Sequence, residues 1–297
     1  MMEHLDTVQL ESGYLLNSLV AEGSRARVYL AESNKDMRGQ VVIKFLREDE
    51  FPDNAIATAD MNHEGQCLTL SAHANVVSKI DSGSNANGRP YLVTEYLKGQ
   101  SLKQLFSEGP LDPGTLMNII MPLTHALENM HKVGVLHLDL RPDKIIVEQP
   151  KKNPQVKIIG FGRAKFLPWA GREQAVQPMQ KSGLYSLQYT SPEQAMDKRC
   201  LPASDVYSLG CIIYEGLVGR PAIQGENELH VMAQHLSGKL QAPSQVKGDA
   251  SLRKFDEVVM QALANETHRR FVDAAELREA LQRVSPSGGW MARLFKK

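Results

Sequence analysis

The hydrophobic positions of this chain follow two different periods. In the first hundred residues, short apolar runs over 14–20, 26–31, 41–46 and 90–97 lie between polar turns, which predicts β-strands, the first two joined as a hairpin. After residue 112, apolar residues recur at three- and four-residue intervals, which predicts a core helix. Its apolar positions are Leu116, Ile119, Ile120, Leu123, Leu127 and Met130.

The composition is that of a chain that buries a substantial core. Its 297 residues, 42% of them hydrophobic, fit one large domain or two lobes that share a cleft. Lysine plus arginine equal aspartate plus glutamate at 34 each, so the overall charge gives no reason to expect nucleic acid as a partner. The N-terminus lacks the apolar run of a signal peptide and no window reaches bilayer-spanning length, so we expect a soluble protein.

The three cysteines, Cys67, Cys200 and Cys211, lie far apart and form no CxxC pair. This spacing argues against a zinc site and against a disulfide framework. The expected location is therefore a reducing cytoplasm.

One stretch carries most of the chemistry. It contains His137-Leu138-Asp139, a lysine five residues beyond that aspartate (Lys144), and then Gly160-Phe161-Gly162. It resembles the catalytic and metal-binding loops of the protein kinase family, in which His-Arg-Asp and a later Asn are followed by Asp-Phe-Gly. The resemblance places Lys144 at the family's asparagine and Gly160 at its first loop aspartate. Both side chains that hold magnesium ions in a kinase are therefore absent.

The resemblance covers about residues 14–284 and implies the family's α+β bilobal fold. It implies a small antiparallel-sheet N-lobe with one helix (14–96) and a larger, mainly helical C-lobe (97–284). The C-lobe retains scaffold positions of the family: Asp205 is expected to cap the catalytic-loop backbone, and Glu193 is expected to pair with Arg270.

The hairpin corresponds to the family's glycine-rich loop with two replacements. Val20 and Val28 flank its turn, and Ala21, Gly23 and Ala26 stand at the three glycine positions. Glycines there let backbone amides approach phosphate oxygens, so the added methyl groups count against close approach. Taken alone, this segment is better explained as an ordinary surface hairpin.

The resemblance assigns the phosphate-binding lysine to Lys44 and its helix partner to Glu64. A lysine inside an apolar strand is uncommon without a partner, which supports the assignment. The alternative for Glu64 is an ordinary solvated helix position. Val42 replaces the small alanine above the adenine ring, and overfilling a packed site typically costs about 1 to 3 kcal/mol. This replacement counts against tight purine binding.

The other nucleotide contacts map onto the connection between the lobes and the strand after the catalytic loop. Thr94 corresponds to the position that controls pocket depth, and the backbone of Glu95 and Leu97 is expected to face adenine. With Ile146 and Lys144, these residues complete the candidate site for ATP or ADP.

The resemblance also assigns the catalytic base. Asp139 corresponds to the aspartate that accepts the proton of the substrate hydroxyl, and Arg141 replaces the lysine two residues on. Leu138 replaces the arginine that reads a phosphorylated activation segment, so we expect no control by that modification.

The charges of the cleft decide the functional prediction. Gly160 removes a carboxylate ligand and Lys144 adds an ammonium, so magnesium is expected to be repelled and no bound metal is expected. The chain is predicted to be a pseudokinase, a scaffold or switch that binds partner proteins and keeps Asp139 and Lys44 as vestigial or weak catalytic residues. The alternative is a weak or unconventional ATP-dependent serine/threonine kinase in which Lys144 replaces the metal, with Lys44, Arg141 and Arg25 as candidate assisting charges and Asp139 as the base. A pairing of Lys144 with Asp139 would instead silence the base.

The two ends of the chain are expected to lie outside this domain. Residues 1–13 are assigned to an N-terminal extension, and 285–297 to a Gly/Ser linker followed by an aromatic and basic peptide at 290–297. Such ends are commonly mobile or pack back on their own domain. The alternative is a docking peptide for a protein partner or a weak membrane-surface contact.

Overall fold

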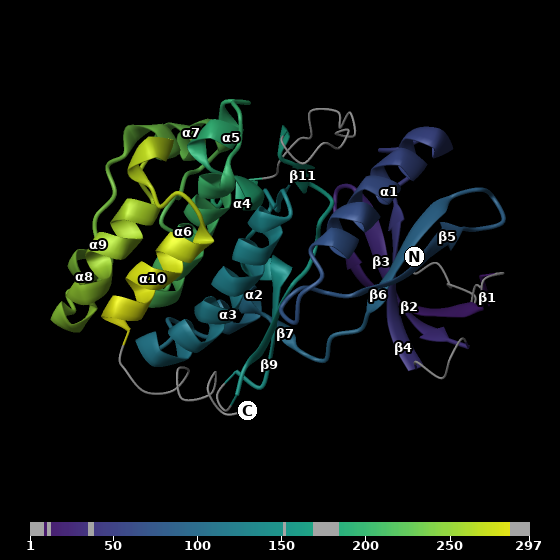
Figure 1. The fold of residues 1–297 in the computed structure, drawn as a ribbon, viewed down its shortest axis with the longest axis horizontal. Coiled ribbons are helices and arrows are strands. Elements are labelled where there is room, and N and C mark those ends of the chain that lie inside the picture. Colours follow the sequence, from purple (N-terminus) through teal and green to yellow (C-terminus); the bar gives the residue numbers. More distant parts are fainter. Residues whose placement is uncertain (1–8, 11–12, 35–38, 151–152, 169–183, 286–297) are drawn as a thin grey trace.

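The structure, a computed structural model, describes residues 9–10, 13–34, 39–150, 153–168 and 184–285. These residues form two lobes, a sheet with a helix at one end of the molecule and a group of helices at the other (Figure 1). The expected α+β architecture, with an antiparallel N-lobe and a larger helical C-lobe, is confirmed. The proposed tail peptide at 290–297 and most of the proposed extension at 1–13 lie outside the described residues.

The N-lobe sheet has strands in the order β1-β2-β3-β4-β6-β5, all paired antiparallel. Its strands are β1 (Gln9–Leu10), β2 (Tyr14–Glu22), β3 (Ala26–Ser33), β4 (Gly39–Leu46), β5 (Lys79–Ser84) and β6 (Pro90–Glu95). β2 and β3 form the predicted hairpin. In β4, Val41 and Ile43 are buried in the core of the sheet. Because successive side chains of a strand point to opposite faces, Val42 and Lys44 share the other face.

Helix α1 (Asn54–Leu70) packs against this sheet, with contacts to β5 and β6 (Figure 1). Asp53 starts the helix, because its side chain accepts hydrogen bonds from the backbone N–H groups of Ala55 and Ile56. The buried face of α1 includes Glu64, so this glutamate is not the solvated helix residue of the alternative interpretation.

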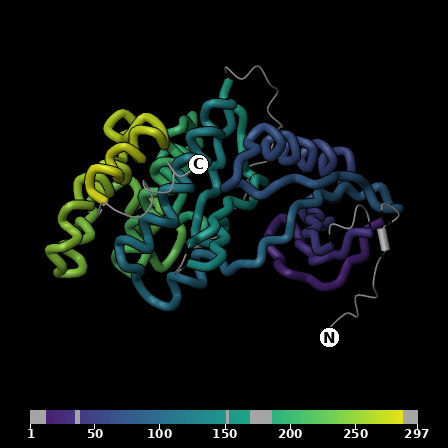
Figure 2. Tube along the Cα trace, turned by 60° about the horizontal axis from the view of Figure 1, so that its bottom comes forward, coloured from purple at the N-terminus to yellow at the C-terminus, as the bar shows by residue number. Residues whose placement is uncertain are grey.

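The C-lobe is built around α6, which is buried along almost its whole length and contacts α3, α8, α9 and α10. The predicted core helix is α3, which begins after the Asp112 cap with Pro113 in its first turn. Both views show these helices gathered away from the sheet (Figures 1 and 2). The helices are α2 (Leu102–Ser107), α3 (Pro113–Lys132), α4 (Leu184–Leu187), α5 (Pro192–Ala195), α6 (Pro202–Val218), α7 (Glu228–Ser237), α8 (Pro243–Lys247), α9 (Arg253–Ala262) and α10 (Ala274–Val284), with 3-10 turns η1 (Pro142–Lys144), η3 (Ala250–Leu252) and η4 (Thr267–Arg269).

Short strands lie between the lobes and carry the loops of the candidate site. β9 (Ile145–Glu148) is the middle strand of a three-stranded sheet, between β10 (Gln155–Ile158) and β7 (Gln100–Ser101). A second pair joins β8 (Val135–Leu136) to β11 (Lys165–Phe166). Within the described residues, every helix is too short or too polar to span a lipid bilayer.

Candidate active site

The register of β9 and β10 brings Lys144 and Gly160 together. The two strands pair antiparallel with Ile145 opposite Ile158, so the residues just beyond that pair meet at one end of the hairpin. The backbone N–H of Ile159 donates to the carbonyl of Lys144, with an N···O distance of 2.9 Å. Two positions sixteen residues apart in sequence are therefore neighbours.

The side chain of Lys144 fills the space into which a side chain at position 160 would project. A Cβ atom placed on Gly160 would lie 2.8 Å from Cδ, 3.1 Å from Cε and 3.4 Å from Nζ of Lys144. Gly160 also has a φ of +84°, a backbone conformation that residues with a Cβ rarely adopt. The two departures from the kinase pattern are thus one structural feature, because the lysine fits beside a residue without a side chain.

The ammonium of Lys144 lies among carboxylates without joining the base. Its Nζ is 3.9 Å from Oδ2 of Asp143, and its side chain is 24% exposed. Among the described residues its ion-pair partner is Asp143 and not Asp139, so the pairing that would silence the base is not formed. Burial lowers the pKa of Lys144, and the negative charge of Asp139 opposes part of that shift.

The donor atoms at this place do not fit the two-metal site of a kinase. Gly160 has no side-chain oxygen, and the chain of Lys144 runs through the adjoining space. No group of three or more His, Cys, Asp or Glu side chains in the described part of the chain is arranged to hold a metal ion. A divalent cation placed here would face an ammonium at short range.

The predicted contact between Lys44 and Glu64 is present. Nζ of Lys44 lies 2.5 Å from Oε2 of Glu64, and the two side chains are 20% and 4% exposed. Lys44 reaches the glutamate from β4, and Glu64 projects from the buried face of α1. The N-lobe therefore holds the lysine in the position that the kinase resemblance implies for phosphate binding.

Asp139 is held in a network that leaves its carboxylate partly accessible. Its backbone N–H donates to Nδ1 of His137 at 3.2 Å, and the hydroxyl of Ser186 donates to its Oδ1 at 3.3 Å. Nε of Arg141 lies 3.6 Å from the same oxygen and 3.0 Å from Oδ1 of Asp143. The Asp139 side chain is 12% exposed, so the carboxylate is held mostly buried in this network.

His137 supports this network as a neutral imidazole. Its Nδ1 accepts from the Asp139 backbone, and its Nε2 lies 3.2 Å from the carbonyl of Ile159, to which a neutral ring donates. Burial lowers the pKa of His137, which agrees with this assignment. Its ring also meets Phe161 edge-on, with centroids 5.0 Å apart.

The remaining nucleotide candidates fall at separate places around the cleft. Val28 lies opposite Lys44, and Val42 lies opposite Thr94, so these four occupy adjoining strand positions. Val20 is 53% exposed at the outer part of the hairpin. Their contacts with adenine or ribose stay a prediction.

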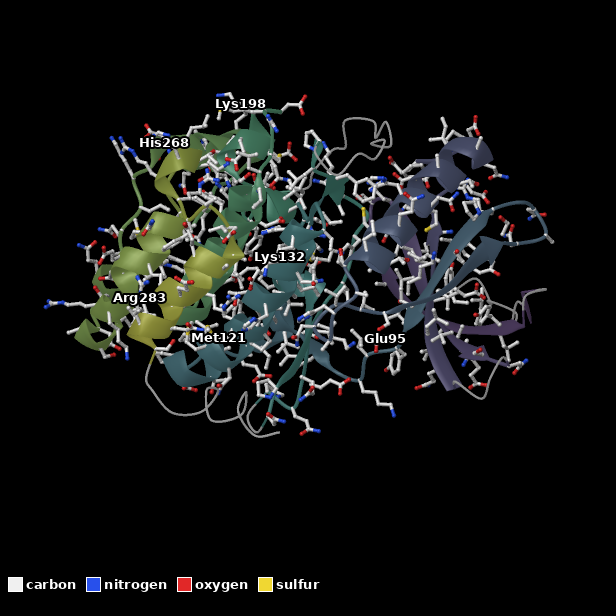
Figure 3. The ribbon with its side chains drawn as sticks, viewed as in Figure 1. Glu95, Met121, Lys132, Lys198, His268 and Arg283 are labelled. Atoms are coloured by element: carbon white, nitrogen blue, oxygen red, sulfur yellow. The ribbon has the colours of Figure 1, made fainter. Side chains whose placement is uncertain are left out.

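The connection between the lobes is fixed by Glu95, which lies where the two lobes meet (Figure 3). Its carboxylate accepts from Nζ of Lys157 at 2.6 Å and from the backbone N–H of Ser78 at 2.7 Å. Leu97 packs against the main hydrophobic core, which includes residues of both lobes, and Ile146 of β9 pairs with β7. The side chain of Glu95 thus has a structural role, and the adenine contact of its backbone stays a prediction.

The catalytic loop rests on Asp205, as predicted. The fully buried carboxylate accepts from the backbone N–H groups of His137 at 2.9 Å and Leu138 at 2.8 Å. It also bonds Nε2 of His131 at 3.0 Å, so this histidine has a structural role. Leu138 has a φ of +58°, and its side chain packs with Leu136 and Leu167.

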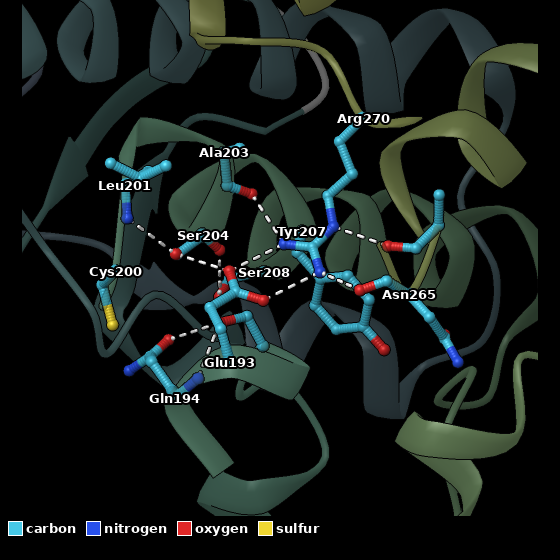
Figure 4. Close-up of polar contacts among 12 residues, drawn as sticks. Glu193, Gln194, Cys200, Leu201, Ala203, Ser204, Tyr207, Ser208, Asn265 and Arg270 are labelled. Atoms are coloured by element: carbon cyan, nitrogen blue, oxygen red, sulfur yellow. Dashed lines mark hydrogen bonds and ion pairs between the residues drawn. The ribbon is translucent and has the colours of Figure 1, made fainter. Parts of the chain in front are cut away.

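The predicted pair of Glu193 and Arg270 also forms, and its atoms are almost entirely buried. The guanidinium makes two bonds to the carboxylate, at 2.8 Å and 2.9 Å (Figure 4). Ser204 donates to Glu193 at 2.6 Å, while the carbonyls of Ala203 and Asn265 accept from Arg270. Burial raises the pKa of Glu193, but the contacts with Arg270 and Ser204 outweigh it and hold that pKa below the usual value.

Sequence reasoning missed three residues that the structure places at the site. Ser186 contacts Asp139 and lies seven residues before Glu193 in the sequence. Arg163 follows Gly162 near Asp139, and burial lowers its pKa. Asp60 is four residues before Glu64, a spacing that puts both on one helix face and could have identified it.

The sequence is similar to known protein kinases. The family profile described as "Protein kinase domain" matches residues 14–287. The chain is 33% identical over 279 residues to serine/threonine-protein kinase PknB of Mycolicibacterium smegmatis, covering 93% of this chain and 43% of that protein. It is 32% identical over 279 residues to PknB of Mycobacterium tuberculosis, with the same two coverages. It is 28% identical over 292 residues to the probable PknB of Bifidobacterium longum, covering 95% and 41%.

The chain therefore spans less than half the length of these relatives. The region matched by the family profile, residues 14–287, contains both lobes and the candidate site. Since the profile covers most of the chain, the chain belongs to the protein kinase family.

Proposed function

We propose that this chain is an ATP-dependent serine/threonine phosphotransferase that supplies a phosphate-binding cation from its own side chain, Lys144. The observation that carries this proposal is the position of Lys144 beside Gly160, where its ammonium projects toward the cleft that contains Asp139. The names of the relatives, which are serine/threonine kinases, support the reaction class. The serine/threonine kinase names of the relatives support this proposal over the pseudokinase prediction, which is kept below as the second candidate function.

In this proposal, different residues of the cleft bind the phosphates and accept the proton. Lys44, fixed by Glu64, and Lys144 provide positive charge for the phosphates of ATP. Asp139 accepts the proton of a serine or threonine hydroxyl, whose oxygen then attacks the γ-phosphorus. The bond from that phosphorus to the β–γ bridging oxygen breaks, which yields the phosphorylated protein and ADP.

The charge on Lys144 also sets a pH dependence. Because burial lowers its pKa, the ammonium loses its proton at a lower pH than an ordinary lysine does. Metal-free ATP binding is therefore expected to weaken toward alkaline pH. In a Lys144→Arg variant, which keeps the charge, this loss is expected to disappear.

A second candidate function is a non-catalytic scaffold or switch that binds a protein partner. The observation that favours it is the crowding beside Lys44: a Cβ placed on Gly162 would lie 3.2 Å from Nζ of Lys44 and 3.3 Å from a terminal nitrogen of Arg25. With Val42 above the adenine position, this crowding would keep ATP out. The tail at 290–297 remains a proposed docking peptide for such a partner.

Phosphate transfer in the presence of EDTA tests the proposal. Purified protein is incubated with γ-labelled ATP and casein, with excess EDTA or with magnesium, and labelled phosphoserine and phosphothreonine are measured. We expect transfer to persist in EDTA and to fall on the order of 100-fold or more in Asp139→Asn. Lys144→Ala is expected to lose the EDTA-resistant transfer, whereas Lys132→Ala, on the exposed surface, keeps it.

Two results would decide against it. Transfer that requires magnesium and is unaffected by Lys144→Ala would show that the lysine is not the phosphate cation. Absence of transfer under both conditions, together with no stabilisation by millimolar ATP, would favour the scaffold.

A further inference from the structure

A second basic side chain, Arg25, reaches from the β2–β3 hairpin toward helix α1 and the loop at Gly162. It lies at the turn between β2 and β3, yet its side chain is only 15% exposed. One terminal nitrogen donates to Oδ1 of Asp60 at 2.8 Å, and the other donates to the carbonyl of Gly162. The guanidinium carbon also lies 5.1 Å from the centre of the Phe51 ring. A single side chain thus connects the hairpin, helix α1 and the loop after Gly160.

This contact lies directly beside the ion pair between Lys44 and Glu64. Asp60 and Glu64 are one helical turn apart on the buried face of α1. A Cβ placed on Gly162 would lie 3.2 Å from Lys44, 3.3 Å from Arg25 and 3.4 Å from Glu64. The two ion pairs therefore meet around one glycine, and a shift of α1 that breaks one pair also stretches the other.

The burial of Asp60 makes Arg25 necessary for this arrangement. The Asp60 side chain is 6% exposed, and its Oδ2 is buried without a hydrogen bond among the described residues. Burial raises the pKa of Asp60, and the charge of Arg25 opposes that shift. Without Arg25, the carboxylate would be an unpaired buried charge, which α1 could relieve by moving Asp60 into water.

The geometry also separates Arg25 from the phosphate-binding groups. Both terminal nitrogens of Arg25 are occupied by protein oxygens, and its Nε is buried without a hydrogen bond among the described residues. The guanidinium is therefore committed to the protein, unlike the ammonium of Lys144, whose ion-pair partner among the described residues is 3.9 Å away.

We propose that Arg25 is a positioning residue that latches α1 through Asp60 and the carbonyl of Gly162, so that Glu64 remains on Lys44 without a signal from the activation segment. The latch replaces a link that the catalytic loop cannot make, because Leu138 packs in an apolar cluster and carries no charge. It acts on the placement of α1 and does not require phosphate transfer.

Hydrogen exchange and lysine labelling test the latch. Four proteins are compared: the natural chain, Arg25→Gln, Arg25→Gln with Asp60→Asn, and Arg27→Gln as the control. Arg27 is on the same hairpin but pairs with Glu22 at the exposed surface. In Arg25→Gln, we expect amide exchange in residues 54–70 to rise on the order of tenfold, and Lys44 to react faster with an amine-selective acylating reagent. A Glu64→Gln variant gives the labelling rate of an unpaired Lys44.

The second substitution distinguishes a charge latch from loss of packing. Removing the stranded carboxylate in Arg25→Gln with Asp60→Asn is expected to return most of the exchange in 54–70 toward that of the natural chain. Unchanged exchange and labelling in Arg25→Gln, or the same change in Arg27→Gln, would overturn the proposal. An equal defect in the single and double variants would also overturn it. None of these readouts depends on ATP, so they stand even if the proposed phosphotransferase activity fails.

Discussion

The arrangement of charged residues differs between the cleft around Lys144 and a C-lobe network made of Asp205, Glu193 and Arg270. In the C-lobe network, Arg270 donates two hydrogen bonds to Glu193, and Asp205 accepts hydrogen bonds from the backbone of the catalytic loop. In the cleft, Lys144 has Asp143 at 3.9 Å and retains charge that is not neutralised at hydrogen-bond distance. Within the described residues, Lys144 therefore differs from the C-lobe network in having no carboxylate at hydrogen-bond distance, whereas Lys44 of the same cleft is paired with Glu64.

This difference teaches that the kinase fold does not depend on the metal-binding side chains. The network that supports the catalytic loop is made from α6, α5 and the segment before α10, and none of its contacts involves position 144 or 160. Substitutions in the C-lobe network are expected to alter folding stability, and substitutions in the cleft are expected to alter ligand binding. The predictions below test that division and are ordered by the size of the change expected.

The largest effect is expected from removing the carboxylate of Glu193. Glu193→Ala leaves the guanidinium of Arg270, which has a fully buried side chain, without its counter-charge. Breaking a buried pair in this way costs about 3 to 5 kcal/mol of unfolding free energy. Thermal or urea unfolding measures it, with Glu266→Ala as the control, since Glu266 pairs with Arg269 at the exposed surface. A loss in Glu193→Ala no larger than the control's would contradict the role assigned to this pair.

The next effect is an acid-induced loss of stability at His235. Its Nδ1 accepts from the hydroxyl of Tyr207 at 2.6 Å, and its Nε2 donates to the carbonyl of Leu187 at 2.7 Å, an arrangement of the neutral ring. Burial lowers the pKa of His235 to about 4. The unfolded chain therefore binds the proton more readily than the folded chain does between about pH 6.5 and pH 4.

Stability is accordingly expected to fall as pH decreases through that window, with His235 contributing about 3 kcal/mol at most. Unfolding free energies measured from pH 7 to pH 4 check this. His235→Gln, whose amide can keep both hydrogen bonds, should show a shallower decline. An identical decline in both proteins would remove His235 as the cause.

A smaller effect on stability, but a qualitative effect on binding, is expected at Gly160. Gly160→Asp introduces a Cβ 2.8 Å from Cδ of Lys144 at a positive φ, which should cost about 1 to 3 kcal/mol. Adding Lys144→Asn makes room for the carboxylate, so the double variant should recover part of that loss. It should also acquire magnesium-dependent stabilisation by ATP. Additive losses and no response to magnesium would show that the two positions are not coupled.

The smallest effect is expected at the exposed pair of Arg283 and Glu279, which are 3.8 Å apart near the end of α10. Arg283→Gln should change the unfolding free energy by less than about 0.5 kcal/mol. Thermal unfolding provides the measurement. A loss comparable to that of Glu193→Ala would mean that burial does not explain the difference between charged sites.

The same contrast explains what the sequence could predict. In the C-lobe network, Asp205, Glu193 and Arg270 are the residues that the kinase family has at these positions. The sequence alone could therefore predict the partner of each. In the cleft, the identities of Lys144 and Gly160 revealed the loss of metal ligands, but not the course of the lysine side chain. That course depends on the β9–β10 register and on the positive φ of Gly160, which arise from tertiary structure.

The latch residues illustrate a second limit. The sequence alone offers Arg25 as an additional charge for the phosphates, because a basic residue on that hairpin has no local feature that ties it to α1. Its partner Asp60 is an acid on a helix where buried residues occur on several sides. The spacing to Glu64 could place Asp60 on the buried face, but its pairing with Arg25 depends on how the hairpin and α1 are placed in the folded N-lobe.

The most direct test of the central claim is the shift in melting temperature that ATP causes in the presence of EDTA. If Lys144 is the cation of the phosphate site, ATP at 100 times its dissociation constant should stabilise the metal-free protein by about 2.7 kcal/mol, and Lys144→Ala should lose that shift. A shift that vanishes on chelation and returns with magnesium in the natural chain would contradict it.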